Sequence, residues 1–175
     1  TSNICTAHLL LAVISAMYAV YHGPDGLRRL AEQVHSRAVL LARALKALGY
    51  TVVHEAFFDT ACVEVERWAL PRLVEAARAR RINLRVLTPT RLTIALDETV
   101  GFGDLADLIT VFGLDSALPE VGHGPTDTGA FALPASFRRT SAYLTHPVCH
   151  RYHSETEMLR YLRRLEARDL SRRID

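Results

Sequence analysis

Residues 59–66 read DTACVEVE, and this stretch decides the fold class. Every second residue is apolar, so Ala61, Val63 and Val65 fall on one face of an extended chain. The residues between them are mostly polar, which is the pattern of a strand in a sheet with one solvated face. We therefore expect a β-strand here.

The segments that follow continue this architecture. PRLVEAARARR, residues 71–81, predicts a short amphipathic helix. Residues 82–87 and 90–96 predict two further strands separated by a Thr-Pro turn, and the apolar spacing at 105–112 predicts another helix. The expected order is βαββα.

Two helices are expected before this strand. Residues 1–22 begin with N-cap residue types and are then apolar around the whole circumference, so this helix should be covered on every side. Because such a helix begins at residue 1, we expect a segment of a larger protein. The turn GPDG at 23–26 leads to a second helix, residues 27–48, which has one apolar stripe and ends at Gly49.

These patterns divide the chain into three parts. Residues 1–48 are expected to form a long buried helix and a connecting helix, and residues 49–113 a small α/β domain. Residues 114–175 are expected to form a loop or arm followed by a C-terminal helix, because 114–138 are rich in Pro and Gly and show no sustained period.

Composition excludes several classes of function. The chain has 175 residues, 49% hydrophobic and 23% charged, which suits one ordinary domain or slightly more. A net charge of +2 gives no field that predicts nucleic-acid or membrane binding, and the longest apolar run, residues 9–21, is too short to span a bilayer comfortably. Three cysteines without a CxxC pair indicate a reduced cytoplasm and no disulfide framework.

A group of histidines near the C-terminus is the first candidate site. His146, His150 and His153 precede Ser154, an N-cap residue, so we expect them on irregular chain without the i, i+4 spacing of a helical zinc motif. We interpret them as hydrogen-bonding residues of a packed segment. A metal-binding interaction domain that uses these histidines with Cys149 is an alternative.

GFGDLA, residues 101–106, imitates a glycine-rich dinucleotide turn, with Glu120 about twenty residues further on. The second parallel strand that such a site requires is missing, and Glu120 falls in the loop. We therefore interpret Asp104 as the cap of the next helix.

The last helix is rich in arginine. Ser154 and Glu157 form a capping box that opens it, and it is expected to run to about Asp169. Its arginines are compatible with phosphate binding, but interspersed carboxylates favour a solvated helix face.

Five segments together resemble one known family. They are TSNICTA (1–7), MYAVYHGPDGL (17–27), FFDT (57–60), LDETV (96–100) and RTSAYLTHPVCHRYHSETEMLRYLRRLE (139–166). In this order they resemble glycine decarboxylase, the P-protein of the glycine cleavage system, and the last string is highly specific. His8 stands where the family has glutamine, and Cys149 where phenylalanine is usual, so neither residue is given a family-wide role.

The resemblance implies a pyridoxal-phosphate (PLP) enzyme of the aspartate-aminotransferase-like fold. The chain would be α/β, the small domain of such an enzyme, with long helices packed on a mainly antiparallel βαββα sheet. It would be the later part of the N-terminal half, which lacks the Schiff-base lysine. Lys46, the only lysine, is expected at an exposed helix end that does not suit the cofactor. No cofactor is therefore expected on this chain, and the isolated chain is expected to be inactive.

The implied whole enzyme decarboxylates glycine and passes the aminomethyl group to the lipoyl H-protein, as a glycine dehydrogenase of the bacterial cytoplasm. Implied partners are the PLP-carrying half of the same enzyme, the H-protein and further copies in a homo-oligomer, without nucleic acid or membrane. We interpret residues 141–153, the histidine-rich string, as a contact between halves or subunits near the active-site mouth. The candidate residues for this contact are Ser2, Asn3, Arg139, Thr140, Ser141, His146, His150 and His153.

A ferredoxin-like regulatory module that binds a small molecule, without enzymatic activity, is a further alternative, because βαββα also opens that arrangement. The apolar first helix argues against it, since a free-standing sensor has no need of a helix covered on all sides.

Overall fold

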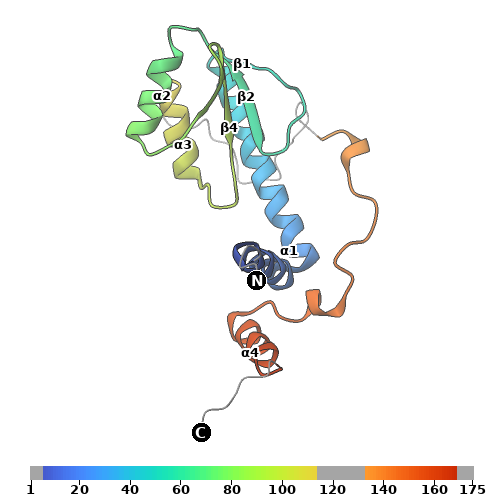
Figure 1. The fold of residues 1–175 in the computed structure, drawn as a ribbon. Helices are drawn as coiled ribbons and strands as arrows, with labels where there is room; N and C mark the ends of the chain where they lie inside the picture. Colours follow the sequence, from blue (N-terminus) through green and yellow to red (C-terminus); the bar gives the residue numbers. More distant parts are fainter. Residues whose placement is uncertain (1–5, 114–132, 169–175) are drawn as a thin grey trace. The chain divides into compact units, whose positions relative to one another are not determined.

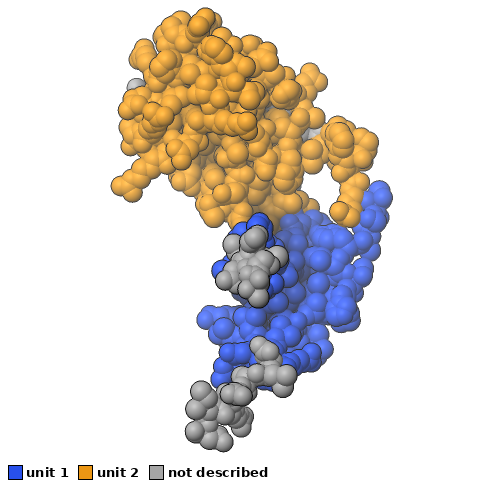
Figure 2. All heavy atoms as spheres, in the orientation of Figure 1, with its two compact units in different colours: residues 1–29, 140–175 blue, residues 30–139 orange. Residues whose placement is uncertain are grey.

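The computed structural model describes residues 6–113 and 133–168, whose contacts separate into two compact units, coloured differently in Figure 2. Unit 1 combines residues 1–29 with residues 140–175, and unit 2 is residues 30–139. Unit 1 is therefore assembled from segments that lie far apart in the sequence.

The long helical segment α1 (Thr6–Ala47) is two helices joined at Gly23. Gly23 has φ 64° and ψ 179°, a conformation that residues with a Cβ rarely adopt. The next residue, Pro24, has no amide N–H, so the carbonyl of Val20 loses its helical donor. The predicted break between two helices is thus confirmed, although it is a kink at Gly23 and not a four-residue turn.

Unit 2 contains the predicted sheet, whose elements appear in Figure 1. They are β1 (Thr51–Val52), β2 (Thr60–Glu64), α2 (Leu70–Ala79), β3 (Arg85–Thr88), β4 (Arg91–Ala95) and α3 (Phe102–Val111). The strand order is β1-β2-β4-β3, and every pairing is antiparallel. The βαββα order is confirmed, and the two-residue β1 is an addition that periodicity did not predict.

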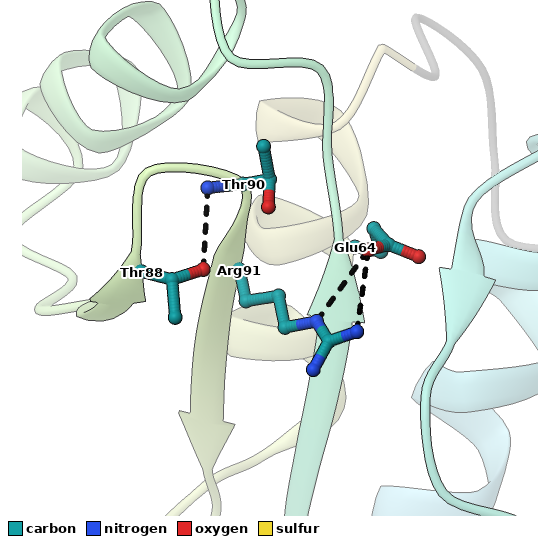
Figure 3. Close-up of polar contacts among 4 residues, drawn as sticks. All are labelled: Glu64, Thr88, Thr90 and Arg91. Atoms are coloured by element: carbon teal, nitrogen blue, oxygen red, sulfur yellow. Dashed lines mark hydrogen bonds and ion pairs between the residues drawn. The ribbon is translucent and has the colours of Figure 1, made fainter.

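The register of the sheet separates an apolar face from a polar one. Val63 lies opposite Leu92 on the apolar face. On the other face, Arg91 Nε and Nη2 each lie 3.4 Å from Glu64 Oε1, and this cross-strand pair is drawn in Figure 3. Cys62 departs from the predicted alternation, because it is buried although its neighbours in β2 on that face are exposed.

One hydrophobic core joins the sheet to the helices of unit 2. It combines the last turns of α1 with α2, α3 and the apolar strand positions. Leu41, Leu45, Leu92 and Leu105 are completely buried, and each such side chain contributes about 1.5–3 kcal/mol of transfer free energy. This core fixes the ends of the strands and hence the turns between them, such as the one that the Thr90 amide closes by donating to Thr88 Oγ1 at 3.3 Å (Figure 3).

Unit 1 consists of the first segment of α1, the short 3-10 helix η4 (Pro147–His150) and α4 (Glu155–Glu166). The capping box of α4 is confirmed, since the Glu157 amide donates to Ser154 Oγ at 3.3 Å. The helix ends at Glu166, with Ala167 as its C-cap residue, about three residues before the predicted end near Asp169. No helix in the described parts of the chain is both long and apolar enough to cross a membrane.

The structure differs from two predictions, one about the first helix and one about the loop at 114–138. Leu9, Leu10 and Leu11 are 62–63% exposed, so within the described residues the first helix is not covered on every side as expected. The predicted loop at 114–138 lies mostly outside the described residues, and its last part forms the 3-10 helix η3 (Ala135–Phe137).

Candidate functional site

The break in α1 is closed by side chains of the histidine-rich string. The Tyr143 hydroxyl donates to the Pro24 carbonyl at 2.5 Å, and His153 Nδ1 lies 2.7 Å from the Tyr21 carbonyl oxygen. Because a carbonyl oxygen only accepts hydrogen bonds, Nδ1 of His153 carries the proton. Carbonyl groups on both sides of Gly23 are thus satisfied by residues more than a hundred positions away in the sequence.

The packing at Gly23 leaves no room for a side chain. A Cβ on this residue would stand 2.7 Å from the Cys149 carbonyl oxygen and 2.8 Å from His153 Cε1. The Cys149 side chain is itself buried, with 6% of its surface exposed. The helix break and the string therefore fit each other closely within unit 1.

The other two histidines of the string also bond to the backbone of this chain. The Val148 amide donates to His146 Nδ1 at 3.2 Å, which makes His146 the N-cap of η4. His150 Nε2 lies 3.0 Å from the Leu144 carbonyl oxygen. His150 is part of η4, so the prediction of irregular chain is wrong for this residue. The predicted hydrogen bonding of the histidines is confirmed, and it does not require a partner surface.

The remaining candidate contact residues that the structure describes are exposed. Arg139 is exposed at the end of unit 2, and Thr140 and Ser141 are exposed at the start of the second segment of unit 1. Ser2 and Asn3 lie outside the described residues.

The described residues form no metal cluster, and the surroundings of Lys46 do not suit PLP. Among residues 6–113 and 133–168, no three His, Cys, Asp or Glu side chains gather closely enough to hold a metal ion. Lys46 is exposed in the last turn of α1, where helix carbonyls disfavour a phosphate. PLP requires an amine in a shielded pocket and a phosphate cradle, so the surroundings of Lys46 do not fit this cofactor.

The glycine-rich turn before α3 is used to cap that helix. The Gly101 amide donates to Asp104 Oδ2 at 2.7 Å. The predicted capping role of Asp104 is confirmed, although Asp104 stands at the third position of α3 and Gly101 is the N-cap residue. The amide that a phosphate would need here is thus already bonded, and Glu120 lies outside the described residues.

A second turn, between β4 and α3, carries the one clear electrostatic perturbation among the described residues. The Thr99 hydroxyl donates to Asp97 Oδ1 at 2.6 Å, and the Thr99 amide donates to the same oxygen at 2.9 Å. These two bonds hold the pKa of Asp97 below its ordinary value of 3.8.

A groove beside α4 is a feature that the sequence patterns did not indicate. It has a volume of about 640 Å³ and is lined chiefly by Arg151, Tyr152, Glu157, Arg160, Arg163 and Arg164. The rings of Tyr152 and Tyr161 stack with centroids 4.2 Å apart, and Arg164 Nη2 donates to the Tyr152 hydroxyl at 2.9 Å. The spacing of arginines in α4 was the only available signal, and the prediction of a solvated helix face did not include this groove.

Comparison with known proteins gives a consistent result. A family model described as "Glycine cleavage system P-protein" matches residues 1–112. The chain is 50% identical over 176 residues to the "Glycine dehydrogenase (decarboxylating)" of Nostoc punctiforme, and 50% identical over 171 residues to that of Thermosynechococcus vestitus. It is 46% identical over 175 residues to the protein of the same name from Nostoc sp. PCC 7120. Each match covers 98% of this chain but only 17–18% of the relative's length.

Proposed function

Since the chain belongs to the glycine cleavage system P-protein family, we propose that it functions as part of a glycine dehydrogenase (decarboxylating). The observation that carries this proposal is the 50% identity across 98% of the chain to a protein of that name, of which the chain covers 18%. Such a share leaves most of the catalytic apparatus to other parts of the enzyme.

In the proposed whole enzyme, glycine is decarboxylated with PLP as the electron sink, and the aminomethyl group passes to the lipoyl group of the H-protein. The poor fit of Lys46 to PLP supports a structural role for this chain. In this role it supplies the antiparallel small domain of an aspartate-aminotransferase-like fold, and the residues that hold PLP belong to the other half. The predicted division at residues 48 and 113 is part of the same proposal.

We place the contact with the PLP-carrying half on unit 1. The exposed leucines 9–11 support this placement, because a large exposed apolar surface favours burial against another protein surface. Residues 140–153, which include the histidine-rich string, belong to the same unit, whereas Arg139 belongs to unit 2. The same exposed apolar surface supports a homo-oligomer, and cyanobacterial relatives together with the lack of a CxxC pair support a place in the bacterial cytoplasm.

The test is a chimera of the Nostoc punctiforme enzyme in which this chain replaces the matching segment. We expect the chimera to release CO₂ from glycine, in the presence of PLP and lipoyl H-protein, at a rate within about tenfold of the parent enzyme. A chimera in which the same segment is deleted is the negative control. A chimera that matches the parent in size and PLP absorbance but releases no CO₂ would count against the proposal, and so would one that fails to assemble.

The two alternatives from the sequence have less support. The ferredoxin-like regulatory module is not supported, because the family match includes the whole βαββα region. The metal-binding alternative has no supporting cluster in the described residues, where one ring nitrogen of each of the three histidines bonds to the backbone.

A further inference from the structure

The groove beside α4 is positively charged and lies entirely within unit 1. Arg160, Arg163 and Arg164 stand on one face of α4, opposite the buried Met158, and Arg151 approaches from the segment before the helix. The side chain of Arg163 is 82% exposed. The groove therefore presents several guanidinium groups to whatever enters it.

The carboxylates near these arginines already have partners in the chain. Ser154 Oγ donates to Glu157 Oε2 at 3.1 Å, as part of the cap of α4. Arg163 Nη1 lies 2.7 Å from Glu166 Oε2. Arg160 and Arg164 form no ion pair with a carboxylate of the described residues, so the net field in the groove is positive.

Aromatic packing fixes one wall of the groove. The Arg164 guanidinium carbon lies 5.4 Å from the centre of the Tyr152 ring, and Tyr152 stacks on Tyr161. The hydrogen bond from Arg164 to the Tyr152 hydroxyl reduces the freedom of this arginine further. A rigid tyrosine beside arginines is the composition that carries most binding energy at protein interfaces.

The geometry favours an acidic protein surface over a single phosphate. Arginines three to four residues apart on one helix are spaced about 4.5–6 Å along its axis, which fits a row of carboxylates. A phosphate site usually uses free amides at a helix N-terminus. In α4 that position is occupied by the helix's own capping box of Ser154 and Glu157.

We propose that the arginine–tyrosine groove of α4 is the surface on which an acidic face of the lipoyl carrier protein docks. This assignment rests on the proposed function, which requires a carrier protein, and adds where that carrier binds. Arg160 and Arg164 make the charged contacts, and Tyr152 supplies the apolar wall.

The test uses the active chimera with the double substitution Arg160→Glu/Arg164→Glu. The matched control is Arg72→Glu/Arg78→Glu, which makes the same change of charge on exposed positions of α2 in unit 2. Glycine decarboxylation is measured with lipoyl carrier protein as acceptor and, separately, with free lipoamide, which needs no protein docking. Activity with lipoamide also reports whether each variant is folded.

We expect the α4 variant to raise the KM for the carrier about tenfold or more, with a smaller effect at high salt, and to leave the rate with lipoamide unchanged. The α2 control should leave both values unchanged. An unchanged carrier KM, or an equal rise in both variants, would overturn the docking assignment. The assignment would also be overturned if inorganic phosphate weakened carrier binding more than chloride does at equal ionic strength. That result would show that the groove binds a phosphate group. If the unsubstituted chimera is inactive even with lipoamide, the proposed function fails instead.

Discussion

The substitution Gly23→Ala tests the closure of the helix break directly. The backbone at Gly23, with φ 64° and ψ 179°, costs a residue with a Cβ about 1–3 kcal/mol. The new Cβ would also stand 2.7 Å from the Cys149 carbonyl oxygen, so the string must move away. If that movement breaks the hydrogen bond between His153 and Tyr21, about 1 kcal/mol more is lost. The expected destabilisation of unit 1 is therefore about 2–4 kcal/mol.

Hydrogen exchange measures this effect within unit 1. Peptides covering residues 143–158 should exchange about thirtyfold faster or more in Gly23→Ala, while peptides covering α3 should keep their protection. Two alanine variants separate the causes. Gly49→Ala, at φ 87° with open space around it, should show strain of about 1–2 kcal/mol without the clash. Gly103→Ala, which has no positive φ and no near neighbour, should be neutral or stabilising by up to about 1 kcal/mol. If Gly23→Ala exchanges no faster than Gly103→Ala, the close packing at the break is refuted.

Three further predictions address single contacts. Tyr143→Phe removes the donor to the Pro24 carbonyl and should weaken protection of unit 1 by about 1 kcal/mol in the same exchange experiment, and unchanged exchange would contradict this contact. Leu105→Ala empties a completely buried position in unit 2 and should lower the free energy of unfolding by about 2–5 kcal/mol in urea denaturation followed by circular dichroism, whereas a loss below about 1 kcal/mol would show that the site is not tightly packed. Thr99→Val removes one of the bonds that lower the pKa of Asp97, so NMR titration should show that pKa rising toward 3.8. Because the pKa of Asp97 is lowered in the folded protein, the ionised carboxylate stabilises the fold above pH 3.8, and this stabilisation is lost as the pH falls through the lowered pKa. A variant in which Asp97 titrates as in the wild type would refute the role of the Thr99 hydroxyl.

Much of unit 2 could be predicted from the sequence because its signals are local. The alternation in DTACVEVE identified β2, and the change of period on either side identified α2 and α3. β1 was missed because two residues are too few to show a period. Cys62 was expected on the solvated face, but a small apolar thiol is readily buried there without any change in the alternation.

Unit 1 shows where local patterns stop being informative. GPDG predicted the break in α1 but not what closes it, since Tyr143 and His153 lie 119 and 132 residues from the carbonyl groups they contact. The apolar character of the first helix was predicted, but the surface that covers it was not. Periodicity shows that a surface is apolar, but it does not show whether the covering surface belongs to the same segment.

The histidine-rich string and α4 differ in how far contacts within the chain explain their residues, although both belong to the segment that most resembles the family. The side chains of Tyr143 and His153 close the helix break, because they bond to carbonyl groups on either side of Gly23. Their residue types are thus explained by packing within the chain and give no independent argument for chemistry. The charged face of α4 makes fewer internal contacts: Arg164 donates to the Tyr152 hydroxyl, Arg163 pairs with Glu166, and the only buried residue of the helix, Met158, lies on the opposite side. A test of partner binding by this segment should therefore begin with substitutions of the arginines in α4. The histidine-rich string should be left unchanged in those variants, because it holds unit 1 together.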